Sequence, residues 1–315
     1  MLASVTPRTD SILQVAVVIP CLDEESTIGK VIADMKAALP SAEIFVFDNA
    51  SSDRTAEIAR ASGATVIPSP RRGKGNVIRH MANVVEADAY LLLDGDDTYP
   101  AAESPRLLRR FVEDRIDMLV ATRLDSHDER AFRVFHKLGN RVIAGIISLL
   151  FRAPVTDVLS GYRILSSRFV RLVHLRSEGF EIETEMTLQA LAKGLSILEV
   201  PIEYGTRPAG SQSKLDTVSD GLLIFKSIFL LFKDYKPFVF FSAVAAVLAL
   251  ASLIAGSAPV FDFYRYQFVY HVPRAILAAG LAVLAAVSFG VGLLLDTISR
   301  YQQETIEQWK RSMRE

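Results

Sequence analysis

An acidic cluster, Asp94-Gly95-Asp96-Asp97, directly follows the apolar residues 90–93 and precedes Thr98. A short apolar run that ends in polar residues is typical of a buried strand of a parallel sheet. Carboxylates at the end of such a strand project into the cleft where ligands of α/β proteins bind. Their hard oxygens suit Mg²⁺ or Mn²⁺, which carboxylates commonly share with substrate phosphates. The pattern therefore predicts a divalent metal at Asp94 and Asp96; a solvated acidic loop is the alternative.

Two more polar clusters follow predicted strands, Asp23-Glu24-Glu25 after residues 15–20 and Asp48-Asn49 after residues 44–47. Further strands are predicted at residues 65–67, 90–93, 117–120 and 197–201, and helices at residues 25–39, 53–62, 75–87, 133–150 and 178–193. Alternation of this kind predicts a three-layer α/β domain with a mainly parallel sheet. The polar clusters then meet beyond the carboxyl ends of the strands.

Two stretches near the C-terminus, residues 237–256 and 275–295, contain no charged side chain. Each is long enough as a helix to cross the roughly 30 Å hydrocarbon core of a bilayer. They predict a transmembrane hairpin; a buried helical hairpin of a soluble protein is the alternative. Aromatic residues between the stretches resemble an interfacial belt. Lysine and arginine are more frequent before the first stretch and after the second than in the loop between them. This distribution predicts that both ends of the chain are cytoplasmic.

The charge balance is nearly even, with 35 basic and 36 acidic residues, so no nucleic-acid partner is expected. A single cysteine, Cys21, excludes an intramolecular disulfide. We expect a disordered start at 1–12, a catalytic domain at 13–216, an amphipathic interfacial helix at 217–235, the hairpin at 236–298 and a cytoplasmic tail at 299–315. Ordinary packing would also explain the apolar stripe of residues 217–235. Small hairpin residues such as Ala243 and Gly280 allow helix association, so a homo-oligomer is compatible with the sequence.

Five motifs carry a resemblance to a known family. They are Val18-Ile19-Pro20-Cys21-Leu22-Asp23-Glu24-Glu25, Asp48-Asn49-Ala50-Ser51-Ser52-Asp53-Arg54-Thr55, Gly73-Lys74-Gly75, Asp94-Gly95-Asp96-Asp97 and Asp157-Val158-Leu159-Ser160-Gly161-Tyr162-Arg163. Together with the paired apolar stretches, they resemble the family 2 glycosyltransferases of the GT-A fold, in the branch that includes dolichyl-phosphate mannose synthase. Arg54 departs from the glycine usual at its position. The resemblance covers nearly the whole chain.

The resemblance implies a donor site and a metal site. Pro20, Leu22 and Glu24 would line the base and ribose pocket, Asp48 would meet the base or ribose, and Lys74 and Asp94 would complete the donor site. The metal-diphosphate would be held by Asp94 and Asp96. Thr98 stands at a polar metal-side position where some relatives have glutamine. Two alternatives come from the residues themselves: Asp23 and Glu25 cap the following helix, and Lys74 is a solvated loop charge.

The resemblance also implies an acceptor site for a lipid phosphate, made by Arg123, Arg133, Arg207 and Lys214. Arginine suits this task because it binds phosphate through two hydrogen bonds and stays charged. Each cation is alternatively a surface charge or an anchor to anionic lipid. Asp157 is the candidate base or orienting group, or else the cap of the Ser160-Gly161 turn. The acids of residues 180–185 receive no role.

By this resemblance the chain would be an inverting transferase with Asp96, Asp157 and Arg133 at its catalytic centre. It would move a hexose or N-acetylhexosamine from a nucleotide diphosphate sugar, with a UDP-sugar favoured over GDP-mannose, to undecaprenyl or another polyprenyl phosphate at the inner (cytoplasmic) membrane. A nucleotidylyltransferase is disfavoured by the absence of a Gly-X-Gly-Thr-Arg loop before Asp48. A processive polysaccharide synthase is disfavoured by the lack of Gln-X-X-Arg-Trp, and a non-catalytic scaffold by the intact acidic motifs.

Overall fold

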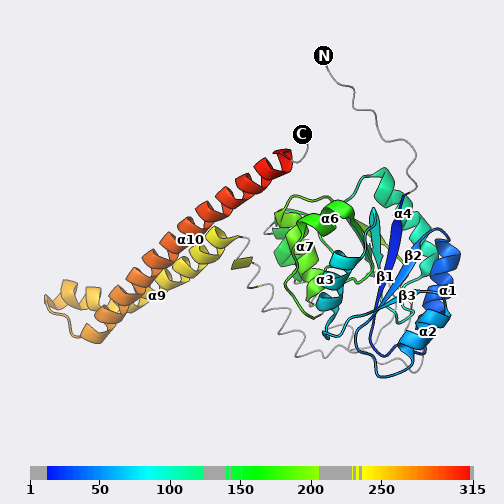
Figure 1. The fold of residues 1–315 in the computed structure, drawn as a ribbon. Helices are drawn as coiled ribbons and strands as arrows, with labels where there is room; N and C mark the ends of the chain where they lie inside the picture. The colour runs from blue at the N-terminus through cyan, green and yellow to red at the C-terminus, as the bar shows by residue number, and fades with distance from the viewer. Residues whose placement is uncertain are drawn as a thin grey trace, which may run out of the picture. The chain divides into compact units, whose positions relative to one another are not determined.

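The computed structural model describes residues 13–123, 140–141, 143–149, 151–179, 181–205, 229, 232–233 and 236–312. The chain divides into two compact units, Met1–Ser227 and Ile228–Glu315 (Figure 1). The first contains β1 (Val15–Cys21), α1 (Ile28–Ala38), β2 (Glu43–Asp48), α2 (Thr55–Ala61), β3 (Thr65–Pro68), α3 (Lys74–Val84), β4 (Ala89–Leu92), the 3₁₀ helix η1 (Ala101–Glu103), α4 (Ser104–Glu113), β5 (Met118–Thr122), β6 (Arg163–Ser166), α6 (Ser167–Leu172), α7 (Ile182–Ala192) and β7 (Ile197–Pro201). The second contains α9 (Pro237–Tyr266) and α10 (Val272–Ser312).

One seven-stranded sheet organises the first unit, in the order β3-β2-β1-β4-β6-β5-β7. Strand β6 is antiparallel to both of its neighbours, β4 and β5, while the other pairings are parallel. The carboxyl ends of β1, β2 and β4 therefore lie at the same edge. The predicted α/β class with a mainly parallel sheet is confirmed.

Helices cover both faces of the sheet. Successive residues of β1 point to opposite sides, and their apolar side chains are buried on each side. Val17 and Ile19 face a core shared with α1, α2 and α4, whereas Ala16 and Val18 face a core shared with α3, α6 and α7. The same two groups of helices flank the strands in Figure 1. Burial on both faces explains why β1 reads as an unbroken apolar run. The predicted three-layer arrangement is confirmed.

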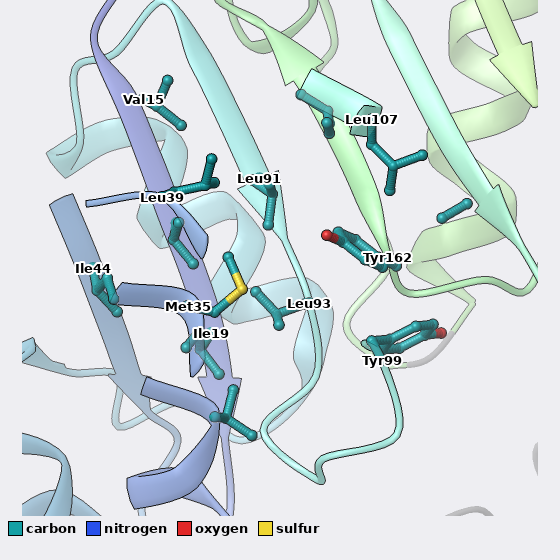
Figure 2. Packing of buried hydrophobic residues seen from close by; sticks show 14 of the residues in the cluster. Val15, Ile19, Met35, Leu39, Ile44, Leu91, Leu93, Tyr99, Leu107 and Tyr162 are labelled. Atoms are coloured by element: carbon teal, nitrogen blue, oxygen red, sulfur yellow. The ribbon is translucent and has the colours of Figure 1, made fainter. Parts of the chain in front are cut away.

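The core on the α1 side reaches the strand ends through two tyrosines. Figure 2 shows the rings of Tyr99 and Tyr162 next to one another, and their centroids are 5.3 Å apart in an edge-to-face contact. The Tyr162 hydroxyl lies 2.6 Å from the Ser104 hydroxyl, which satisfies both buried groups. These tyrosines tie the segment after β4 to the start of β6.

Strand β6, the 3₁₀ helix η1 and the helices α4 and α6 were not predicted from the sequence. Residues 163–166 do not show the alternation of apolar and polar side chains that marks a strand in the sequence. The strand begins at Arg163, and the side chain of this arginine is fully buried. Burial of an arginine contradicts the pattern by which strands are recognised. The segment is a strand because it fills the gap between β4 and β5 and pairs with both.

The second unit is a helical hairpin with a short connection. Helix α9 ends at Tyr266 and is capped by Gln267, whose left-handed backbone (φ +55°) is typical of a helix C-terminus. The Asp262 carboxylate accepts from the backbone N–H groups of Tyr270 and His271, which closes the turn. Both predicted apolar stretches lie inside these helices, which run further than the charge-free residues alone. Residues 299–312, assigned to a tail by sequence, continue α10.

Both hairpin helices are long and apolar enough to cross a membrane. Only 6% of the most apolar window of α9 and 11% of that of α10 are buried. A core hairpin of a soluble protein would instead be mostly covered. The two helices therefore indicate membrane association. The predicted lead-in, residues 1–12, and most of the predicted interfacial helix, residues 217–235, lie outside the described residues.

Close packing at the start of α3 generates a stability prediction. A Cβ placed on Gly75 would lie 2.1 Å from the backbone oxygen of Ser177. We expect Gly75→Ala to lower the free energy of unfolding by about 2 kcal/mol, because a backbone segment would have to move. Thermal unfolding of the full chain in detergent, followed by circular dichroism, measures this loss.

Gly145→Ala is the matched control for that change. Gly145 lies in helical backbone, and a Cβ there meets no described atom within 4 Å. Alanine should leave stability unchanged or raise it by about 0.5 kcal/mol through its better helix propensity. Equal stability of the two variants would contradict the close approach at Gly75.

Candidate functional site

The ends of β1 and β4 are in contact at the edge where the polar clusters gather. The Thr27 hydroxyl donates to the backbone oxygen of Gly95 over 2.7 Å. A Cβ on Gly95 would lie 2.8 Å from Cys21 Sγ and 3.7 Å from Glu24 Cγ. Glu24 therefore lies beside the acidic cluster, and its side chain is buried. Pro20 and Leu22, which precede it in the chain, are half-buried.

Asn49 organises the neighbouring loops. Its side-chain N–H₂ donates to the backbone oxygens of Ser69 and Arg71, and its oxygen accepts from the N–H of Gly73 over 2.7 Å. Asp48, the last residue of β2, accepts from the N–H of Ser51 and is half-buried. The loop that leads to Lys74 at the start of α3 is therefore anchored to the end of β2.

The structure corrects the capping role considered for Asp23 and Glu25. Asp23 Oδ1 accepts from the Ser52 N–H over 2.6 Å, and Glu25 Oε2 accepts from the Arg54 N–H over 3.1 Å. Helix α1 begins later, at Ile28. The two carboxylates instead join the loop after β1 to the loop after β2, because those strands are adjacent in the sheet.

Within the acidic cluster, each aspartate has a different neighbour. Asp96 is 3% exposed, and its Oδ1 accepts from the hydroxyl of Thr98 over 2.5 Å. Asp97 adopts φ +58° and pairs with Lys30 over 2.8 Å. Thr98 is itself buried, and its hydrogen bond orients the carboxylate of Asp96.

Lys74 lies between two carboxylates from distant parts of the chain. Its Nζ is 2.5 Å from Asp94 Oδ1 and 2.7 Å from Glu183 Oε1, and its side chain is only 10% exposed. Burial by itself lowers the pKa of Lys74, but the negative charges of Asp94 and Glu183 outweigh it and raise the pKa well above its ordinary value. Lys74 is therefore an internal cation paired with two carboxylates, and its low exposure rules out the solvated alternative.

The loop before β6 packs directly against this group. A Cβ on Gly161 would lie 2.7 Å from both Asp94 Oδ2 and Lys74 Nζ, so a larger residue there would displace these two groups. The Gly161 N–H donates to the hydroxyl of Tyr99 over 3.0 Å. The Asp157–Arg163 motif is thus joined to the acidic cluster, although about sixty residues separate them in sequence.

Arg123 and Asp157 form a second ion pair near this loop. The backbone N–H, Nε and Nη2 of Arg123 all donate to Asp157, at 3.1, 3.2 and 3.2 Å. Asn140 Nδ2 and the Leu159 N–H complete five donors to a carboxylate that is 1% exposed. Burial raises the pKa of Asp157, but the charge and hydrogen bonds of Arg123 lower it more, so the pKa lies below its ordinary value.

The other side of the Arg123 guanidinium remains available. Its carbon lies 5.6 Å from the centre of the Tyr204 ring, and the side chain is 28% exposed. Within the part of the chain that the structure describes, Nη1 donates no hydrogen bond. The predicted phosphate-binding residues Arg133, Arg207 and Lys214 lie outside the described residues.

Known proteins resemble the chain in both sequence and fold. Residues 16–171 match the family model of Glycosyl transferase family 2. The glycosyltransferase AglJ of Haloferax volcanii is 31% identical over 284 residues, which cover 89% of this chain and 90% of that protein. A dolichyl-phosphate hexose transferase of the same organism is 31% identical over 213 residues, or 68% of this chain and 91% of that protein. The chain belongs to glycosyl transferase family 2.

The fold of the glycosyltransferase domain agrees with this assignment. The crystal structure of glucosyl-3-phosphoglycerate synthase from Mycobacterium tuberculosis, in complex with Mn²⁺ and UDP-glucose, superposes with a TM-score of 0.56. At 22% identity the match covers 70% of this chain and 78% of that chain, and it establishes the fold. The family and the GT-A fold expected from the motifs are confirmed. A nucleotidylyltransferase is excluded by the family.

Two residues of the glycosyltransferase site were missed by sequence reasoning. Glu183 was seen only as one of several acids, and Arg163 only as the end of a motif. Arg163 is fully buried and donates to Ser160 O, Val158 O and Thr187 Oγ1, so it holds the loop before β6. The available signal was the pair Glu183 and Glu185 inside a short, largely apolar helix. Carboxylates at that spacing point to different faces, and buried ones require partners.

The Asp157 environment generates a pH-dependent stability prediction. Asp157→Asn should lower the free energy of unfolding by about 3 kcal/mol at neutral pH, because a buried partner of Arg123 loses its charge. A lowered native pKa stabilises the fold fully above the unfolded value of about 4, and that contribution is lost as the pH falls through the native pKa. The difference between variant and native protein should therefore be constant from about pH 7 to 5 and shrink below about pH 4.

Unfolding of the full chain in detergent across this pH range measures the difference. Asp114→Asn is the control, because Asp114 pairs with Arg110 on the surface and its loss should cost less than about 1 kcal/mol. A loss at Asp157 that is the same at every pH would contradict the ion-pair explanation.

Proposed function

We propose that this glycosyltransferase moves a hexose or N-acetylhexosamine from a nucleotide diphosphate sugar to a polyprenyl phosphate, with inversion at the anomeric carbon. The observation that carries the proposal is the contact of Gly161 with Lys74 and Asp94. This contact brings a donor-side carboxylate and cation together with the loop that holds Arg123. A phosphate acceptor needs such a cation beside the sugar donor.

The donor side is supported by the arrangement at the ends of β1, β2 and β4. Pro20, Leu22, Glu24 and Asp48 are the proposed contacts of the base and ribose, and Lys74 is the proposed cation for the diphosphate. The solved neighbour with UDP-glucose supports a nucleotide sugar, and we favour UDP over GDP as the carrier.

The acceptor side is supported by Arg123 and by a named relative. One side of the Arg123 guanidinium is fixed by Asp157, and the other can donate to a phosphate oxygen. The relative called dolichyl-phosphate hexose transferase supports a lipid phosphate as acceptor. We propose that Arg133, Arg207 and Lys214 add to this phosphate site.

A divalent metal fits the residues of the site. Among the described residues, no three His, Cys, Asp or Glu side chains are grouped so as to hold an ion by themselves. Two carboxylates, Asp94 and Asp96, with phosphates supplying the remaining oxygens, suit Mg²⁺ or Mn²⁺, which are usually bound in this way. Bound there, the ion would stabilise the negative charge on the leaving diphosphate. The Mn²⁺ of the solved neighbour supports this assignment.

The chemistry requires no strong base. An oxygen of the lipid phosphate forms the new bond to the anomeric carbon, and the bond from that carbon to the diphosphate breaks and leaves its electron pair on the nucleotide. A phosphate monoester with a second pKa of about 6 is already largely dianionic near neutral pH. Asp157, with five donors and a lowered pKa, suits the positioning of Arg123 better than proton removal.

The hairpin supplies the proposed link to the membrane. We propose that α9 and α10 span the inner membrane and that the catalytic domain and both termini are cytoplasmic, as the lysine and arginine distribution predicts. A polyprenyl phosphate also presents its head group at the membrane surface, which agrees with this anchoring.

The direct test uses the full chain, purified in detergent. Undecaprenyl phosphate is incubated with a panel of radiolabelled nucleotide sugars, with and without Mn²⁺, and the lipid fraction is separated. At least one donor should label the lipid in a metal-dependent manner, and undecaprenol without phosphate should remain unlabelled. Absence of labelled lipid with every donor would overturn the proposal.

The metal assignment makes its own prediction. Asp96→Asn should reduce metal-dependent turnover by roughly a hundredfold, because a ligand that balances charge during transfer is lost. Initial rates over a range of Mn²⁺ concentrations measure the effect. Activity equal to that of the native protein would place the metal elsewhere.

The assignment of Arg133 to the acceptor site makes a separate prediction. Arg133→Ala should raise the KM for the lipid phosphate about tenfold, the value of one charge-assisted hydrogen bond, and leave the KM for the nucleotide sugar unchanged. Arg109→Ala, which removes an exposed arginine of α4, is the control and should change neither constant. A change confined to the nucleotide sugar would contradict the assignment.

A further inference from the structure

Lys74 contacts two carboxylates that differ in their surroundings. Asp94 has a side chain that is 32% exposed, whereas the side chain of Glu183 is 4% exposed. Asp94 can therefore be reached by a ligand, and Glu183 cannot. The ammonium of Lys74 occupies Asp94 Oδ1 at 2.5 Å. A divalent cation that binds Asp94 must compete with this ammonium, because two positive charges repel one another at such distances.

Glu183 has capacity for a second hydrogen bond from Lys74. Its Oε1 is 2.7 Å from Lys74 Nζ, while its Oε2 is buried and has no hydrogen-bond partner among the described residues. A buried carboxylate oxygen without a partner is costly. An ammonium carries three donors, so Lys74 can satisfy both oxygens if it moves away from Asp94.

We infer that Lys74 is a displaceable cation and that Glu183 is the positioning residue to which it withdraws when a divalent metal binds Asp94. This inference rests on the metal role proposed for Asp94. Glu183 keeps Lys74 inside the site and lowers the cost of releasing the carboxylate. Gly161 packs against the Lys74 ammonium and the Asp94 carboxylate, so there is little room for Lys74 to move toward the loop before β6.

The inference predicts opposite effects on the binding of Mn²⁺ alone, measured without nucleotide or lipid. Glu183→Gln should weaken Mn²⁺ binding about tenfold, because Lys74 then depends on Asp94 as its only anionic partner. The double variant Lys74→Met/Glu183→Gln should bind Mn²⁺ more tightly than the native protein, because no ammonium competes. The double variant also avoids an unpaired buried charge, which would threaten folding in Lys74→Met alone.

The experiment titrates Mn²⁺ into the full chain in detergent and counts free Mn²⁺ by electron paramagnetic resonance. Two controls match the substitutions. Glu181→Gln changes a neighbouring acid that accepts from the N–H groups of Glu178 and Gly179. Lys30→Met removes the exposed lysine that pairs with Asp97 in the same cluster. Each control should alter Mn²⁺ affinity by less than about threefold, the value of a surface ion pair.

The outcomes separate this inference from the proposed function. Weaker binding in Glu183→Gln combined with tighter binding in the double variant supports the displaceable cation. The inference is overturned if Glu183→Gln binds Mn²⁺ as tightly as the native protein. It is also overturned if the double variant binds Mn²⁺ as weakly as Glu183→Gln, in which case Glu183 acts through its charge alone. Asp96→Asn is titrated in parallel. Mn²⁺ binding that survives this change would overturn the metal site of the proposed function, whatever the result at Glu183.

Discussion

The ammonium of Lys74, enclosed between Asp94 and Glu183, connects three segments that are far apart in the sequence: the start of α3, the end of β4 and the first turn of α7. Removing such a charge from water costs several kcal/mol, which a buried carboxylate partner such as Glu183 offsets. The surrounding backbone is shaped to this requirement. Glycine at positions 75 and 161 allows other segments to approach to distances at which a side chain would collide.

Charges of alternating sign continue from this group toward Arg123. Burial lowers the pKa of Arg163, and the negative charges of Glu183 and Asp157 oppose that shift. Asp157 in turn holds Arg123. Asp94, Lys74, Glu183, Arg163, Asp157 and Arg123 thus form a nearly neutral set in the interior. Such a set holds opposite charges in place beside one another, an arrangement that would suit the two phosphate-bearing substrates that we propose.

The same arrangement separates two tasks that a carboxylate near a phosphate acceptor could perform. Asp157 accepts five hydrogen bonds, so it positions an arginine and has little capacity to take a proton. Thr98 orients Asp96 in a similar way. With the phosphate acceptor that we propose, the nucleophile would already be charged, and catalysis would depend on orientation and on the stabilisation of the leaving group.

The sequence by itself determined the class of fold, the strands that end in the acidic motifs, the family and the two apolar helices. These features depend on local periodicity and on short motifs, which are read along the chain. It did not reveal β6, the partners of Asp23 and Glu25, or the role of Glu183. Those were decided by tertiary structure, because each depends on a contact between segments 20 or more residues apart. A buried Arg163 or Glu183 reads as a surface charge until its partners are known, since only the fold decides which charges are removed from water together.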